Sequence, residues 1–474
     1  MKHATRTTKH VGVSLQPPNI LLIHVDQHRF DCVGVNGHPA AHTPTLDRLA
    51  AEGVNFTHAF CPIAVCMPAR TSLMTGRYAT QHGCLVNDGV EGYRPALAGL
   101  PTLSQTLKAA GYTLGHVGKW GIGLEASPTA LGFDDYVPAS AYRTWRAAQG
   151  LPPPPRTNGW FGEPDTVIAP EESAPAWGAN HVIRLLEQYA SAGAPFFLRW
   201  DPDEPHLPSK PPEPFASLVK PEYVPPWQSF PDPLIGKPYI QRQQLRSWGI
   251  DGWTWEQWAP VVAYYLGVVA LIDHQVGRIL ARLDALGLAK QTLVVYTSDH
   301  GDLCGGHGML DKHYVMYDDV MRVPLLMRWP NHLPVSRTVD AFVTSALDLA
   351  TTFCAAACVE APETFQGHDL IALANGGRAQ RDKVFGSYHG AQFGAYSQRM
   401  VRTRAWKYIW NPTAKDELYH LTVDPGELHN CAADPTCADI LHTLRSDLVA
   451  WMAETKDPLS NEWTRRQLLE GAKS

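Results

Sequence analysis

Three continuous apolar runs of this chain each end in polar side chains. The runs and their polar ends are Asn19–Val25 before Asp26 and Gln27, residues 291–298 before Asp299 and His300, and residues 195–200 before Asp201. Runs that are apolar throughout are typical of parallel strands buried on both faces. In α/β proteins the carboxyl ends of such strands carry the chemistry. The sequence therefore predicts a parallel sheet with a functional site at one edge.

Helical patterns separate these runs. They cover residues 45–52, 103–110 and 261–286, and the last has apolar residues at helical spacing. Alternating strands and helices predict an α/β fold in which a large, doubly wound, mostly parallel sheet is flanked by helices. Proline-rich segments at residues 151–156 and 205–233 indicate long surface loops, which commonly border an active site.

The pattern changes after about residue 365. Short strand-like pieces separated by turn residues follow, and then a helical stretch; the pieces lie at residues 384–387, 400–403, 408–410 and 418–420, and the helix at 437–454. We therefore predict a large α/β domain at residues 1–365. A smaller C-terminal α+β unit at residues 366–474 would consist of a small antiparallel sheet and one helix.

Composition excludes some classes of partner. The net charge of -6 comes without a basic block, so we expect no nucleic-acid partner and no membrane partner. The N-terminal segment has no apolar export core, and no continuous run reaches the roughly 18 apolar residues that span a bilayer, so we expect a cytoplasmic protein. Nine irregularly spaced cysteines then indicate reduced thiols. Cys354 and Cys358 are four residues apart, but without a second pair they indicate core packing.

One stretch, CPIAVCMPARTSLMTGRYATQHG at residues 61–83, contains a Cys-x-Pro-x-Arg array from Cys66 to Arg70, followed by Thr-Gly-Arg. These fixed residue types at fixed spacing resemble the signature of type I sulfatases in the alkaline phosphatase superfamily. The resemblance implies that a formylglycine-generating enzyme oxidises Cys66 to formylglycine (3-oxoalanine), whose hydrate is a metal-bound nucleophile. It covers most of residues 19–455. Only the loops near residues 135–180 and 205–255 lack a counterpart, and we expect them to set specificity.

A second group of residues predicts a metal site. Asp26, Gln27, Asp299 and His300 supply oxygen and imidazole ligands from two strand ends, which suits Ca²⁺, Mg²⁺ or Mn²⁺ better than tetrahedral zinc. The stretch TSDHGDLCGGHGMLDKH around Asp299 also resembles the second sulfatase motif. The resemblance implies that these four residues and the modified Cys66 bind one divalent ion, for which Ca²⁺ is our first expectation and Mn²⁺ or Mg²⁺ are alternatives.

The resemblance also implies roles for cationic and polar side chains. Lys312 contacts the sulfate, and Lys119, in Gly-Lys-Trp, bridges the nucleophile and a sulfate oxygen. His206, in Pro-His-x-Pro, protonates the leaving oxygen. Arg70 is permanently charged and would hold the formylglycine hydroxyl and the charge on the metal side. Asn87 lies where relatives place a polar substrate contact, although Asn-Asp-Gly is equally typical of a turn.

The chain departs from the sulfatase pattern at one position. Gly121 stands where the family has a histidine that is assigned to the proton transfer that eliminates sulfate. Either another base replaces that histidine, with His116 the nearest in sequence, or the chemistry differs.

We therefore predict a hydrolase that cleaves a sulfate monoester, either a sulfated carbohydrate or a small aryl or alkyl sulfate. Such dianionic esters resist attack, so a catalyst needs a divalent metal, cations around the oxygens and a proton donor for the leaving group. The alternative is a phosphonate monoester or phosphodiester hydrolase with the same nucleophile, which Gly121 fits better. A third hypothesis is a non-catalytic protein that binds sulfated ligands. The sequence leaves the oligomeric state open, including a homo-oligomer.

Overall fold

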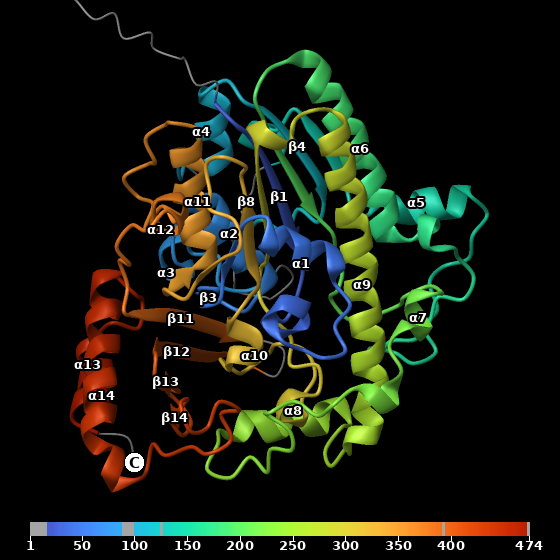
Figure 1. The fold of residues 1–474 in the computed structure, drawn as a ribbon. Helices are drawn as coiled ribbons and strands as arrows, with labels where there is room; N and C mark the ends of the chain where they lie inside the picture. Colours follow the sequence, from blue (N-terminus) through green and yellow to red (C-terminus); the bar gives the residue numbers. More distant parts are fainter. Residues whose placement is uncertain (1–16, 88–98, 124–126, 391–393, 472–474) are drawn as a thin grey trace, which may run out of the picture.

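A mostly parallel sheet of eight strands forms the centre of the protein in the computed structural model (Figure 1). The structure describes residues 17–87, 99–123, 127–390 and 394–471, so residues 1–16 of the N-terminal segment without an apolar export core lie outside the described residues. In spatial order the strands are β5 (Asp135–Pro138), β4 (Thr113–Gly118), β6 (Phe196–Asp201), β1 (Asn19–Val25), β7 (Thr292–Ser298), β8 (Leu325–Arg328), β2 (Val54–Phe56) and β9 (Arg337–Val339). Only β8 runs antiparallel to its neighbours.

Strand β1 is buried on both faces. Ile20 and Leu22 belong to one hydrophobic core, whereas Leu21 and Ile23 belong to another. Each core is completed by helices on its own face, because alternate side chains of a strand point to opposite sides. The helices of the first core are α2 (Cys66–Thr75), α4 (Leu103–Ala109) and α11 (Ser345–Ala356), and those of the second are α1 (Pro44–Ala51), α6 (Ala174–Ala192) and α9 (Trp255–Ala285). This arrangement confirms the predicted doubly wound fold.

Helix α9 begins six residues before the predicted start. Pro260 suggests that a helix starts after it, but Thr254 and Gln257 form a capping box that opens the helix earlier. Pro260 is tolerated near the start of the helix. By length and composition this helix could cross a membrane, although 83% of its most apolar window is buried inside the protein. Its apolar run is interrupted at Asp273, so the prediction about continuous apolar runs stands, and a helix buried in this way equally fits the core of the protein.

Several shorter elements surround the sheet. A two-stranded parallel sheet joins β3 (Ala59–Phe60) and β10 (Val343–Thr344). The other helices before the C-terminal sheet are α3 (Ala79–His82), α5 (Ala141–Ala148), α7 (Phe215–Leu218), α8 (Tyr239–Trp248), α10 (Asp318–Met321) and α12 (Leu370–Ala374). Helices α5, α7, α8 and the start of α6 lie in segments that we expected to be loops. Helix α6 can begin at Ala174 because Ser173 caps it and Pro175 needs no hydrogen-bond acceptor in the first turn.

The C-terminal part contains the predicted small antiparallel sheet. Its strands are consecutive, β11 (Lys383–Gly390), β12 (Tyr396–Thr403), β13 (Trp406–Trp410) and β14 (Glu417–His420), followed by α13 (Ala438–Glu454) and α14 (Glu462–Leu469). Phe385 stacks on Trp451 of α13, with ring centroids 5.2 Å apart. Buried Lys407 forms ion pairs with Asp318 of α10 and with Glu427, so the sheet contacts the large domain through charges. The boundary at residue 365 stays a prediction.

Candidate active site

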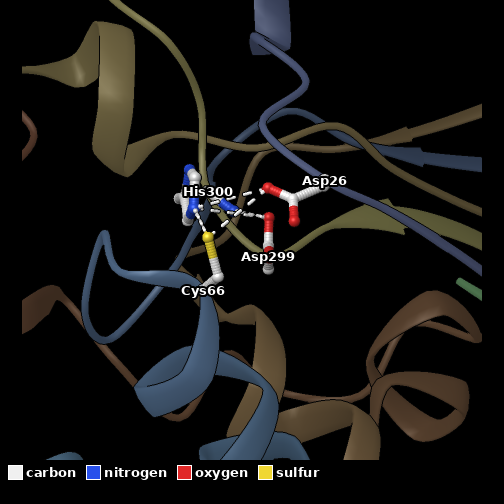
Figure 2. A group of neighbouring side chains, drawn as sticks. All are labelled: Asp26, Cys66, Asp299 and His300. Carbon is white, nitrogen blue, oxygen red and sulfur yellow. Dashed lines mark hydrogen bonds and ion pairs between the residues drawn. The ribbon is translucent and has the colours of Figure 1, made fainter. Parts of the chain in front are cut away.

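Four buried side chains converge where the strands β1 and β7 end (Figure 2). Asp26 follows β1, Asp299 and His300 follow β7, and Cys66 is the first residue of α2. Their ligand atoms lie within 4.8 Å of one another. The Cys66 Sγ is 3.3 Å from His300 Nε2 and 3.6 Å from Asp26 Oδ1. The structure thus brings together four of the five predicted metal ligands, in a cluster of carboxylate, imidazole and sulfur atoms that could hold one cation.

Arg70 joins the carboxylates around this cluster. It lies one helical turn after Cys66 and is fully buried. Its guanidinium donates to Asp299 at 3.0 Å, to Asp201 at 2.7 Å and, more weakly, to Asp26 at 3.4 Å. These bonds fix the three carboxylates, because a guanidinium is planar and always charged. The predicted contact with the charge on the metal side is present, whereas the contact with a hydroxyl at position 66 stays a prediction.

Charge stabilises Asp26 in its ionised form. Burial alone would raise the pKa of this carboxyl group, but Lys119, His206 and Arg70 together hold the pKa well below its usual value. Lys119 follows β4 directly, and its Nζ donates to Asp26 Oδ2 at 2.5 Å while the side chain remains a quarter exposed. Lys119 therefore binds a residue of the candidate metal site and is also partly exposed to solvent, where a substrate would enter.

Asp201, at the end of β6, is not part of the metal cluster. It accepts hydrogen bonds from Arg70 and from Arg199 at 2.6 Å, and it contacts His24 at 3.0 Å. The sequence predicts Asp201 as the polar end of a strand, but it does not predict which residues bind it. His116 lies between Asp201 and the backbone of Lys119. Its Nδ1 is 3.7 Å from Asp201 Oδ2, and its Nε2 is 3.1 Å from the Lys119 carbonyl oxygen. Burial lowers the pKa of His116 to about 3, so the imidazole is neutral and faces Asp201.

Lys312 and His206 meet on the open side of the cluster. Buried Lys312 donates from Nζ to Gln27 Oε1 at 2.8 Å, and this Nζ lies 2.9 Å from His206 Nε2. The other ring nitrogen of His206 contacts the Leu207 carbonyl oxygen at 2.7 Å, which orients the ring. Lys312 and His206, which the resemblance places at the sulfate and at the leaving oxygen, are therefore adjacent.

Gln27 and Asn87 have partners within the protein. The Gln27 amide nitrogen donates to Asp302 at 2.7 Å and to Asp311 at 3.0 Å, while its oxygen accepts from Lys312. Gln27 thus positions Lys312 here, and its role as a metal ligand stays a prediction. Asn87 Oδ1 accepts from the Met67 backbone nitrogen at 3.0 Å, beside Cys66. Its predicted substrate contact is likewise untested by this arrangement.

The missing histidine has a local explanation. Gly121 has a φ of +46°, a left-handed conformation that favours glycine. A Cβ atom at this position would lie 3.1 Å from Arg70 Cδ. A histidine at position 121 would therefore be strained in this backbone conformation and would crowd Arg70.

A pocket of about 600 Å³ opens beside Lys119 and His206. Its far side consists of side chains from α5, from the loop between α5 and α6, and from the segment after His206. Those that the argument uses below are Arg143, Arg146, Arg156, Trp160, Asp165 and Lys210. All six lie in the segments that have no counterpart in the sulfatase pattern.

Comparison with known proteins agrees with this arrangement. An arylsulfatase of Clostridium perfringens is 28% identical and aligns with 91% of this chain and 94% of its own length. Human arylsulfatase A is 27% identical, over 88% and 83% of the two chains. The crystal structure of a phosphonate monoester hydrolase of Agrobacterium radiobacter superposes with a TM-score of 0.81 at 26% identity, and covers 92% of this chain and 96% of that one.

Two family models match the chain. The model described as N-sulphoglucosamine sulphohydrolase, C-terminal, matches residues 305–454, and the sulfatase model matches residues 18–359, which is most of the chain. The second match includes every residue of the candidate metal cluster. The chain therefore belongs to the sulfatase family of sulfuric ester hydrolases.

Proposed function

We propose that this chain hydrolyses a sulfate monoester, with formylglycine made from Cys66 as the nucleophile and one divalent metal ion beside it. The observation that supports this proposal is the convergence of Cys66, Asp26, Asp299 and His300 within 4.8 Å. The donor set suits a hard divalent ion, because two ionised carboxylates and an imidazole are present. The cysteine Sγ occupies the position that the formylglycine oxygens would take. We propose Ca²⁺ as the ion, with Mn²⁺ or Mg²⁺ as alternatives.

The surrounding side chains would each perform a separate task. The hydrated aldehyde would supply a nucleophilic hydroxyl, and the metal would supply positive charge for the oxygens. Lys119 and Lys312 add two further positive charges on the open side, where they would bind the sulfate oxygens. His206 would pass a proton to the leaving alcohol, and its contact with the Leu207 carbonyl oxygen keeps the ring in place. Arg70 keeps the carboxylates Asp26 and Asp299 fixed.

A second candidate function is hydrolysis of phosphonate monoesters or phosphodiesters. Gly121 favours it, since the family histidine that eliminates sulfate is absent and His116 faces Asp201 instead. The likeness to the Agrobacterium radiobacter phosphonate monoester hydrolase also supports it. Lys119 and the neighbouring Trp120 match the sulfatase pattern and support the first proposal.

Two measurements test the proposals. Mass spectrometry of the Cys66 peptide, from protein made together with a formylglycine-generating enzyme, should show a loss of about 18 Da. The modified protein is then given an aryl sulfate and an aryl phosphonate monoester with the same phenol. A higher kcat/KM for the sulfate supports the first function, and the reverse supports the second. If the modified protein binds the sulfate without turning over either ester, both proposals are wrong and the protein is a binding protein.

A further inference from the structure

We infer that the pocket beside Lys119 and His206 binds a second anionic group, carried by a ring in the alcohol part of the substrate. This inference rests on the proposed ester hydrolysis, because it assigns the leaving group to this pocket. Lys119 and His206 form the end of the pocket near the candidate nucleophile. An ester bound there would direct its alcohol away from Cys66, toward α5 and the loop before α6.

The pocket is lined by several cationic side chains, and only some of them form ion pairs. Arg146 is buried and forms two hydrogen bonds with Asp165, at 2.6 and 3.3 Å, so this pair is satisfied. Within the part of the chain that the structure describes, Arg143, Arg156 and Lys210 form no ion pair. These three residues come from separate segments, namely α5, the following loop and the segment after His206. Three positive side chains thus line one cavity, and none of them forms an ion pair with a described residue.

Two of these cations are close neighbours. Burial lowers the pKa of Lys210, and the charge of Arg156 lowers it further. The charges of Glu163 and Asp165 raise the pKa of Lys210 in part, but the Glu163 carboxylate accepts hydrogen bonds from the Thr157 hydroxyl and the Asn158 backbone nitrogen and forms no ion pair with either cation. Two like charges held near each other repel, and an anion bound between them would relieve this repulsion. Arginine and lysine together are also a common binding pair for carboxylates and sulfates.

The acidic residues of the pocket do not cancel this charge. Apart from Asp165, which is paired with Arg146, they are Asp203 and Glu204. Both also line a neighbouring cavity together with Arg143 and Arg156, and burial raises the pKa of both carboxyl groups, that of Glu204 to about 8. Even if both are ionised, three unpaired cations outnumber two carboxylates. The far end of the pocket thus favours a negatively charged substituent.

The shape and lining of the pocket fit a ring. A volume of about 600 Å³ is within the range that holds a small organic ligand. Trp160 lines the pocket, and 54% of its surface is exposed, which is unusual for so large an apolar side chain. An exposed tryptophan face could pack against a sugar or an aromatic ring. The substrate class is therefore a ring-containing sulfate ester that carries a further carboxylate, sulfate or sulfonate.

The test compares esters that differ only in this charge. The modified enzyme is assayed with a nitrophenyl sulfate and with ring-substituted analogues that carry a carboxylate or a sulfonate, all matched in the pKa of the phenol. We expect kcat/KM at least about tenfold higher for the charged esters, which corresponds to the strength of one charge-assisted contact. The carboxylate and sulfonate arms show which anion the subsite prefers.

Variants locate the effect. Arg156→Gln with Lys210→Gln should remove the preference for the charged esters, and turnover of the neutral ester should stay within about twofold. Arg143→Gln should reduce the preference in part. The matched control is Arg48→Gln, since Arg48 is an exposed arginine of α1 outside the pocket, and it should change neither substrate. Equal kcat/KM for charged and neutral esters in the unmutated enzyme would overturn the inference, as would an equal loss for both esters in the double variant.

A binding measurement separates this inference from the proposed function. Calorimetry with the free phenols needs no turnover, and the carboxylated phenol should bind at least about fivefold more tightly than the neutral one. The double variant should lose this difference. If no ester is hydrolysed but the difference in binding is present, the proposed function is wrong and the anionic subsite is supported. If the esters are hydrolysed but the two phenols bind equally, the subsite is wrong and the proposed function stands.

Discussion

The candidate metal cluster and the pocket wall differ in how their charges are satisfied. We call the metal cluster together with its neighbours Arg70 and Asp201 the site floor, which is Asp26, Cys66, Arg70, Asp201, Asp299 and His300. The pocket wall is Arg143, Arg156, Trp160 and Lys210. In the floor every side chain is buried, and Arg70 contacts all three carboxylates. In the wall the two arginines are exposed and form no ion pair among the described residues.

This difference separates chemistry from specificity. A buried charge without a partner is costly, so a change in the floor disturbs the position of several groups at once. An exposed cation can be replaced at small cost in stability, because water already solvates it. The floor residues are therefore suited to the chemical step. The wall residues can be replaced more easily, so they are suited to recognising the alcohol part of the substrate. The following predictions test this division, and the largest expected effect comes first.

Loss of the proposed nucleophile should have the largest effect. Cys66→Ala removes the only side chain of the floor that could become formylglycine, so hydrolysis should fall by at least about 10⁴-fold. The assay is kcat/KM for an aryl sulfate. Cys354→Ala, in the core of α11, is the matched control and should keep activity within about twofold. An active Cys66→Ala protein would place the chemistry outside the floor.

The second prediction concerns His206, which lies between the floor and the pocket. His206→Gln keeps a polar side chain but removes the proposed proton donor. We expect an alkyl sulfate, whose leaving group needs the proton, to lose about 10² to 10⁴-fold in kcat. An aryl sulfate with an acidic phenol should lose much less, because its leaving group departs without protonation. Equal losses for the two esters would assign His206 to binding and not to proton transfer.

The third prediction uses the metal, with stability as the readout. A bound ion should stabilise the fold by about 2.7 kcal/mol when its concentration is one hundred times the Kd. We therefore expect Ca²⁺ to raise the midpoint of thermal unfolding of protein treated with a chelator. Asp299→Asn should abolish this increase, because it removes a carboxylate from the cluster. Mn²⁺ and Mg²⁺ are measured in parallel. An unchanged midpoint with all three ions would contradict a metal site in the floor.

The smallest effect should come from Asn87, which supports the floor from outside. Asn87→Ala removes the acceptor for the Met67 backbone nitrogen at the start of α2 and should cost about 1 kcal/mol of unfolding free energy. Asn461→Ala is the matched control, since Asn461 caps α14 in the same way through Thr464. Both variants should lose stability, but only Asn87→Ala should also lower kcat/KM, because only Asn87 is beside Cys66. Equal activities in the two variants would remove Asn87 from the site.

Much of the fold could be predicted because its signals are local. The run Asn19–Val25 is apolar at every position, and its predicted bounds agree with β1. The predicted C-terminal strands and helix are also present, each shifted by a few residues at the ends. Helix α6 was not predicted, although Ser173 caps it and a proline in the first turn is compatible with a helix.

The sequence by itself determined the residue types of the site and the family to which the chain belongs, because the Cys66 motif and the polar strand ends are short patterns of neighbouring residues. Only the tertiary structure decided how these segments meet. Arg70 reaches Asp299 from 229 positions away, and Lys312 reaches Gln27 from 285 positions away. The same holds for the partners of Asp201 and for the cations of the pocket wall. These contacts depend on the order of strands in the sheet and on the paths of long loops, and short patterns do not contain that information.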